Sequence, residues 1–202
     1  MPRKTGKIKS HKTILIVVEG YTEEIYFSQM KSFERFQEIT IIPKLAKHSS
    51  LMMILSTAIK ESSSGVYDSI WCVFDRDKIE AEGISNEIKN KIKEAKSIGI
   101  KFADSLPAFE IWFLLHYIVP KKYYASQDSL IKALEPYIAG YEKKQEWLRK
   151  ENLYAKLKPI LETALSNSKS LTEKNKINSE TNTAMCNVYR IFEEVLETQT
   201  GK

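Results

Sequence analysis

The stretch IWCVFDRD, residues 70–77, decides how this chain is expected to fold. Five apolar residues, Ile70 to Phe74, run directly into two aspartates that are separated by one arginine. A short apolar run of this kind predicts a buried strand. Carboxylates gathered at the end of such a strand repel one another unless a cation lies between them. The stretch therefore predicts a buried strand that carries Asp75 and Asp77 to a metal-binding edge.

Strand and helix signals alternate on both sides of this stretch. Further strands are expected at residues 13–18, 38–43 and 99–103, and helices at 22–37 (with Thr22 as N-cap), 49–62, 79–98 and 107–118. This alternation predicts an α/β fold with a mostly parallel sheet of about four strands flanked by helices.

Strand signals disappear beyond about residue 121, which predicts a helical C-terminal portion. Helices are expected at 127–139, 142–150, 152–166 and 181–198, and the polar residues 166–180 are expected to form a long loop. We therefore divide the chain into a disordered arm (1–12), an α/β core (13–120) and a helical portion packed on the core (121–202).

The composition is that of an ordinary globular protein. Of 202 residues, 43% are hydrophobic and 28% are charged. No apolar run approaches the ~20 residues that cross a bilayer, and no signal peptide is recognisable. Cys72 and Cys186 have no partners at metal-ligand spacing and are expected to be plain thiols. We expect a cytoplasmic protein without a membrane partner.

The excess positive charge lies in the first twelve residues. The net charge is +5, and this segment holds five cations and no acid: Arg3, Lys4, Lys7, Lys9 and Lys12. Such an arm suits nucleic acid, because lysine and arginine displace counterions from a phosphate backbone. A solubilising tail is the alternative, and the sequence leaves both open.

Acidic residues follow three of the expected strands. Glu19 follows the first strand, Asp75 and Asp77 the third, and Asp104 the fourth. The carboxyl ends of parallel strands share one edge, where ligands bind. Oxygen ligands of this kind suit Mg²⁺, or Mn²⁺, which would bind a phosphoryl group and place a water molecule.

Each acid also has a simpler structural interpretation. Glu23, four residues after Glu19, is either a further metal ligand or a first-turn acid that complements the helix dipole. Asp77 suits the N-cap of the next helix, and Glu19 suits a turn beside Gly20. Their shared position at strand ends favours a common metal site.

Several motifs resemble a known family. ILIVVEGYTEEIYF followed by WCVFDRD looks like a Toprim-type domain, with a glutamate after the first strand and Asp-x-Asp after the third. Adding KIKSHKTILIVVEG, SLPAFEIWFLLHY and INSETNTAMCNVYRIFEEVLE, nearly the whole chain resembles the RloB family, which is associated with prokaryotic restriction and abortive-infection loci. Leu106 and Ser179 depart from that family's usual asparagine and proline at these two positions.

The resemblance implies a Mg²⁺-dependent, nuclease-like site that acts on phosphodiesters in phage defence. Carried over, Glu19, Asp75 and Asp77 would be the metal-binding acids, and Glu23 would match an acid of related Toprim nucleases. RNA or DNA would be the partner, together with a protein from the same defence locus.

The FEIWFLLH segment and the residues around the strand ends offer further candidates. Glu110 is expected near the acids, as a fourth carboxylate or as a base that orients water, or else as a helix-dipole or ion-pair partner. His116 shares a stripe with Phe109 and Trp112 and suits the core better than catalysis. Arg76 should point away from the aspartates and either pair with an acid or bind phosphate. Lys44, Lys47 and His48 either bind a nucleic-acid backbone or form a solvated loop.

Three functions compete. A metal-dependent nuclease is favoured. A phosphatase with an aspartate nucleophile fits less well, because a glutamate-bearing strand precedes the DRD strand. A non-catalytic subunit that binds or senses nucleic acid would rely on the basic arm and the helical portion. No Walker loop or dinucleotide fingerprint occurs, so ATP and NAD are not indicated.

Overall fold

The computed structural model describes residues 11–77, 83–121, 123–178 and 184–200. Its centre is a five-stranded sheet in the order β2 (Ile39–Leu45), β1 (Lys12–Val18), β3 (Ser69–Asp75), β4 (Lys101–Leu106) and β5 (Met185–Cys186). The first four strands are parallel, and β5 runs antiparallel to the end of β4. The mostly parallel α/β sheet is confirmed, and β5 is an addition that the sequence pattern did not predict.

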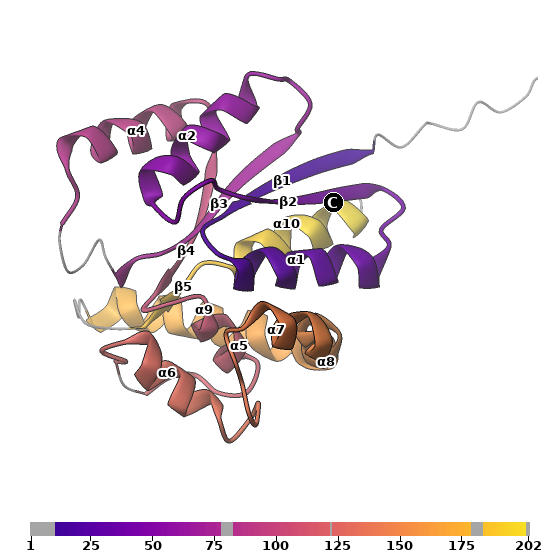
Figure 1. Cartoon of the computed structure of the whole chain (residues 1–202), viewed down its shortest axis with the longest axis vertical. Helices are drawn as coiled ribbons and strands as arrows, with labels where there is room; N and C mark the ends of the chain where they lie inside the picture. The colour runs from indigo at the N-terminus through magenta and orange to yellow at the C-terminus, as the bar shows by residue number, and fades with distance from the viewer. Residues whose placement is uncertain (1–10, 78–82, 122, 179–183, 201–202) are drawn as a thin grey trace, which may run out of the picture.

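Helices cover both faces of this sheet. The helices α2 (Leu51–Ser62) and α4 (Asn86–Ser97) lie on one face, and α1 (Tyr21–Glu34) and α10 (Tyr189–Thr200) lie on the other (Figure 1). Alternate residues of β1 point to opposite faces, and Ile14 to Val18 are all fully buried. Burial on both faces explains why the strands are continuous apolar runs rather than alternating ones.

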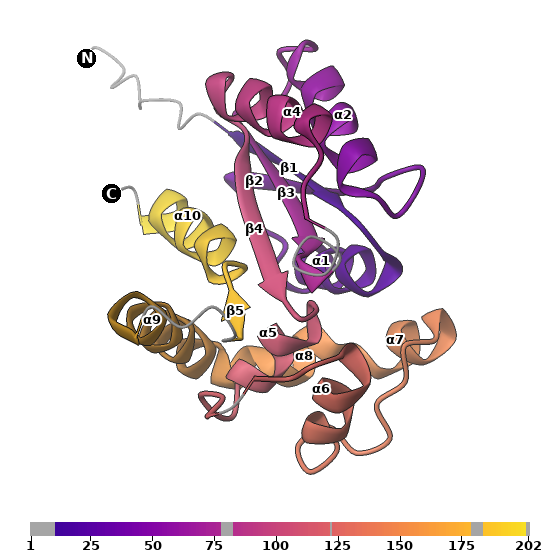
Figure 2. The same ribbon diagram turned by 90° about the vertical axis from the view of Figure 1, so that its left-hand side faces the viewer.

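The remaining helices gather beyond the carboxyl ends of the parallel strands (Figure 2). They are α5 (Glu110–Leu115), α6 (Gln127–Leu134), α7 (Gln145–Glu151), α8 (Leu153–Leu157) and α9 (Leu161–Asn178), with a 3₁₀ turn at Lys158–Ile160. One hydrophobic cluster joins this portion to the α1 face of the sheet. At its centre the Trp112 indole N–H donates to the Tyr26 hydroxyl at 2.9 Å.

Several predicted boundaries in the second half of the chain are wrong. The expected loop at 166–180 is mostly part of α9, because Leu161, Ala164, Leu165, Ser168 and Leu171 bury one face of that helix while Glu162, Ser166, Lys169, Ser170, Glu173 and Lys174 are exposed. The segment 181–198 is not one helix, since β5 precedes α10.

Other boundaries shift by a few residues. The helix expected from residue 79 begins at Asn86 in the described chain, where the Ser85 hydroxyl caps the Ile88 N–H at 3.2 Å. The N-cap of α1 is Gly20 rather than Thr22. The fourth strand extends to Leu106, so Asp104 lies inside it rather than after it.

A buried carboxylate ties α10 to the sheet. Glu194 accepts hydrogen bonds from Ser69 Oγ at 3.2 Å, Trp71 Nε1 at 2.8 Å and Lys101 Nζ at 2.8 Å. It also forms an ion pair with Lys12 at 2.7 Å. Burial alone raises the pKa of Glu194, but these donors outweigh it and lower that pKa to about 2. The carboxylate therefore joins α10 to β1, β3 and β4.

In the part of the chain that the structure describes, none of the helices combines the length and the apolar character that a membrane crossing demands.

Candidate functional site

The predicted acids meet in a cavity at the carboxyl edge of the sheet. This cavity of about 340 Å³, called here the acidic cavity, is lined by Glu19, Glu23, Asp75 and Asp77, together with Gly20, Tyr21, Thr22, Ser49, Gln127 and Lys143. Its position follows from the topology, since β1 and β3 are neighbours and Val18 pairs with Val73. The two strands therefore end side by side and deliver their acids to one place.

Glu19 links the two strand ends directly. Its Oε2 accepts a hydrogen bond from the Asp75 backbone N–H at 3.1 Å, and its Oε1 accepts one from Ser49 Oγ at 2.9 Å. We expected Glu19 and Asp75 to lie within bridging distance of one cation if their strands were adjacent. The two strands, β1 and β3, are adjacent in the sheet.

Glu23 lies in the first turn of α1 and is only 4% exposed. Burial, together with the charges of Glu110 and Glu19, raises its pKa from 4.5 to about 7, although a backbone hydrogen bond and Lys143 oppose the rise. Gly20 makes room for this side chain, because a Cβ at that position would lie 3.0 Å from Glu23 Oε2.

Asp75 has the least satisfied carboxylate of the site. Its Oδ1 is buried and has no hydrogen-bond partner. Burial and the charges of Glu23, Glu110 and Glu19 raise the pKa of Asp75 well above its usual range. A buried carboxylate oxygen without a partner is costly, and a bound cation would remove that cost.

Glu110 lies behind the acidic cavity rather than on its wall. It is fully buried and accepts hydrogen bonds from the Tyr141 hydroxyl at 2.9 Å and from Gln127 Nε2 at 3.0 Å. Lys143 Nζ lies 3.4 Å from its Oε1. Glu110 thus adds negative charge to the site while its own oxygens hold two residues of the cavity wall, Gln127 and Lys143.

Lys143 and Gln127 are site residues that the sequence did not reveal. Burial lowers the pKa of Lys143, but the charges of Glu110, Asp75 and Glu23 outweigh burial and raise it above 10.5. The ammonium group is therefore charged at neutral pH and faces the acids. Both residues come from the helical portion, and no motif marks them in the sequence.

The chemistry of these side chains fits a hard divalent cation, which prefers carboxylate oxygens. Asp75 Oδ1, which has no hydrogen-bond partner, is the oxygen best placed to coordinate such a cation. Across the described residues, no three acidic, imidazole or thiol groups already stand in a metal-holding arrangement. Glu19 is held by Ser49 and by the Asp75 N–H. Binding an ion here therefore requires the acidic side chains to rotate.

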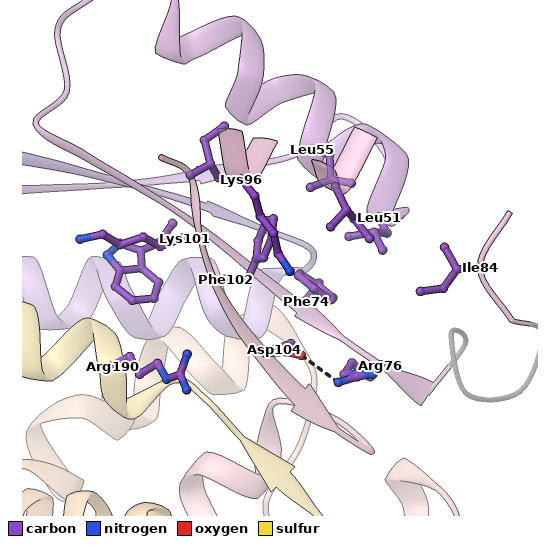
Figure 3. A pocket seen from close by; sticks show the side chains of 13 residues that line it. Leu51, Leu55, Phe74, Arg76, Ile84, Lys96, Lys101, Phe102, Asp104 and Arg190 are labelled. Atoms are coloured by element: carbon purple, nitrogen blue, oxygen red, sulfur yellow. Dashed lines mark hydrogen bonds and ion pairs between the residues drawn. The ribbon is translucent and has the colours of Figure 1, made fainter. Parts of the chain in front are cut away.

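Arg76 and Asp104 lie on the other side of the strand end. Arg76 Nη1 is 3.4 Å from Asp104 Oδ2 (Figure 3), and Asn187 Nδ2 donates to Asp104 Oδ1 at 2.8 Å. Neither Arg76 nor Asp104 lines the acidic cavity. The prediction that Arg76 points away from the aspartates is confirmed, and the expected contribution of Asp104 to the acidic edge is wrong.

The other candidates lie apart from the acidic cavity. His116 is a core residue: Nδ1 lies 2.9 Å from the Trp112 carbonyl oxygen, and burial lowers the pKa of the imidazole to about 4. Lys44 forms an ion pair with Glu61 at 2.6 Å, and Lys47 and His48 are exposed.

Of the basic arm, only Lys12 can be placed. It lies in β1, with its ammonium on Glu194. Arg3, Lys4, Lys7 and Lys9 lie outside the described residues, so a role of the arm in binding nucleic acid remains a prediction.

Comparison with models of protein families gives a match over most of the chain. The sequence model of a family described as RloB-like protein matches residues 14–195, a span that contains every residue of the acidic cavity. No curated protein matches the chain.

Proposed function

The chain belongs to the RloB-like protein family, and from this premise we propose that it is a metal-dependent nuclease that hydrolyses phosphodiester bonds of nucleic acids. The acidic cavity is the proposed active site. Glu19, Asp75 and Asp77 would hold Mg²⁺ or Mn²⁺, with Glu23 beside them as a further ligand.

One observation carries the proposal: a buried, unpartnered oxygen of Asp75 in a cavity lined by four carboxylates. Folded proteins rarely leave such an atom unsatisfied unless a ligand uses it. The raised pKa values of Asp75 and Glu23 support the same conclusion, since each carboxylate lacks a nearby positive charge sufficient to stabilise it.

Each residue has a distinct part in the proposed reaction. A bound divalent ion would supply charge stabilisation for the phosphoryl group that is attacked by water. Lys143 would bind a non-bridging phosphate oxygen with its ammonium group. Glu110 would act as a positioning residue, because its contacts with Gln127, Tyr141 and Lys143 fix the wall of the cavity.

The test compares the Asp75→Asn/Asp77→Asn double variant with the wild type on 5′-labelled single-stranded RNA, single-stranded DNA, duplexes and transfer RNA. Cleavage is expected only for the wild type and only with Mg²⁺ or Mn²⁺, not with EDTA. Glu87→Gln/Glu162→Gln is the matched control, since both residues are exposed and lie outside the cavity. Undiminished cleavage by the aspartate variant would remove these acids from the mechanism.

A second candidate function is a non-catalytic subunit that binds or senses nucleic acid. It is favoured by the absence, among the described residues, of three ligands already arranged around one point. Salt-sensitive binding without metal-dependent turnover, in the same assay, would support it. Titration of Mn²⁺ into both proteins, followed by calorimetry, would show whether the acids bind metal at all.

We also propose, from the resemblance to restriction-associated proteins, that the protein acts in the prokaryotic cytoplasm in defence against phages, together with a partner protein from its own locus. The test is phage plating on cells that carry the locus with either the wild-type gene or the Asp75→Asn/Asp77→Asn gene. Equal plating on both strains would contradict a defence role for the acidic cavity.

A further inference from the structure

A second cavity, of about 560 Å³, follows the outer edge of β4 (Figure 3). We call it the edge groove and define it by Phe74, Arg76, Lys96, Lys101, Phe102 and Arg190. Lys96 comes from α4 on one face of the sheet, and Arg190 comes from α10 on the other. The groove therefore crosses the open side of the sheet between two helices.

The edge is open because β5 is short. Within the described chain, β5 pairs only with Ser105 and Leu106 of β4. The Asn187 N–H donates a hydrogen bond to the Asp104 carbonyl oxygen at 2.9 Å. No described strand lies beside Lys101, Phe102 or Ala103 on that side. Lysines also protect such an edge from pairing with other strands, so charge alone would not indicate a binding site.

Two positive charges in the groove are available to a ligand. Arg76 is paired with Asp104 and Lys101 with Glu194. Lys96 and Arg190, by contrast, are exposed and form no ion pair with any acid of the described residues. The groove thus holds four cations and one acid, and its uncompensated charge is positive.

An aromatic ring lies beside one of these charges. Phe102 is partly exposed, rests edge-on against Phe74 with ring centroids 6.2 Å apart, and has Lys96 Nζ 5.7 Å from its centroid. A partly exposed ring in a groove lined by cations matches an unpaired nucleotide, whose base stacks on an aromatic face while its phosphates bind lysine and arginine. The volume of the groove also falls within the range of small-ligand sites.

We propose that the edge groove binds a single-stranded segment of nucleic acid, with a base against Phe102 and phosphates on Lys96 and Arg190. A duplex does not fit this chemistry, because its bases are already stacked on one another. An acidic peptide added as a strand is less suited, because β4 leaves only a short run of backbone unpaired.

The edge groove and the acidic cavity share one backbone segment. Asp75 and Asp77 line the acidic cavity, and Arg76 between them lines the groove. A single strand of nucleic acid bound in the groove can therefore continue past Arg76 to the acids. The identification of this strand as substrate rests on the proposed nuclease function, whereas its binding does not require cleavage.

The experiment measures fluorescence anisotropy of labelled single-stranded 12-mers, of RNA and DNA, in EDTA at several salt concentrations. The Lys96→Ala/Arg190→Ala variant is expected to bind about tenfold more weakly. Its plot of log affinity against log salt should be shallower by about 1.4, since each phosphate contact contributes about 0.7 for single strands. Phe102→Leu is expected to weaken binding by about tenfold with no change in slope, because stacking carries no charge.

Lys132→Ala/Lys174→Ala is the matched control, because both lysines are exposed and lie on α6 and α9, outside both cavities. It removes the same charge and should bind as the wild type does. Thermal unfolding of each variant confirms that it is folded. The Asp75→Asn/Asp77→Asn variant should keep its affinity in EDTA, so loss of cleavage and loss of groove binding are distinguished.

Four results would overturn the proposal. The first is an affinity and salt slope of the Lys96/Arg190 variant equal to those of the control. The second is binding of the single-stranded 12-mers by Phe102→Leu with the affinity of the wild type. The third is competition by free AMP or UMP as strong as that by the 12-mer, which would indicate a site for a mononucleotide. The fourth is comparable competition by a polyglutamate peptide, which would indicate an acidic polypeptide.

Discussion

The raised pKa of Glu23 makes a quantitative prediction for the metal-free protein. A carboxyl whose pKa rises from 4.5 to about 7 on folding binds more protons in the folded state than in the unfolded state over this interval. The stability that Glu23 contributes is therefore greatest below pH 4.5 and falls as the pH rises to 7. At about 1.4 kcal/mol for each tenfold change in the proton affinity, the loss is about 3 kcal/mol.

The Glu23→Gln variant tests this, because glutamine has almost the same shape and no charge to bury. In EDTA at pH 7.5 the free energy of unfolding of the variant should exceed that of the wild type by up to about 3 kcal/mol, relative to their difference at pH 4.5. The stability of the variant has to be compared with that of the wild type at each pH, because His116 also titrates. Its pKa is lowered to about 4, which makes the stability of both proteins rise with pH over nearly the same interval.

Urea denaturation followed by circular dichroism, at half-unit steps of pH, gives both curves. Saturating Mn²⁺ at pH 7.5 should then stabilise the wild type more than Glu23→Gln, because an ion would compensate the carboxylate that glutamine lacks. If the difference in stability between the two proteins does not vary with pH, the argument that burial destabilises the Glu23 charge is wrong.

Three further outcomes are expected. Glu194→Gln should lose about 3 kcal/mol of stability at pH 7, since the pKa of Glu194 is lowered to about 2. The difference in stability from the wild type should shrink as the pH falls from 4.5 toward 2. Acid denaturation curves that stay parallel would refute this. Gly20→Ala should change stability by less than ~1 kcal/mol, because the new Cβ meets only the terminal carboxyl group of Glu23. It should weaken Mn²⁺ binding several-fold in a calorimetric titration, and unchanged affinity would mean that the position of Glu23 is irrelevant to the ion. Tyr141→Phe should cost about 1–3 kcal/mol in urea denaturation, because it removes a donor from the fully buried Glu110; a cost near zero would show that this hydrogen bond contributes nothing.

The acids at the strand ends could be predicted because their positions depend on local patterns. The apolar run before Asp75 and the one before Glu19 are each long enough to mark a strand. Because the strands are parallel, both acids then lie at the same edge of the sheet. The same logic failed for Asp104, because the fourth strand continues past it to Leu106, and the Asp104 side chain pairs with Arg76.

The rest of the site depends on tertiary packing that no short pattern encodes. Lys143 lies in the connection between α6 and α7, and it reaches the acids only because that connection folds back against α1. The second part of α9, residues 166–178, was missed for a related reason. Leu171 and Ile177 are its only apolar residues in the sequence, too few to mark a helix among the serines, lysines and asparagines.

The position of Gln127 and Lys143 has a consequence for dissecting the protein into pieces. A fragment that ends near residue 120 would contain all the strand-end acids and Glu110, but neither of the two side chains that close the acidic cavity. Glu110 would then lose Tyr141 as well and meet solvent. Truncating the chain near residue 120, where strands give way to helices, would therefore remove part of the acidic cavity. Ligand-binding assays require both halves in one polypeptide.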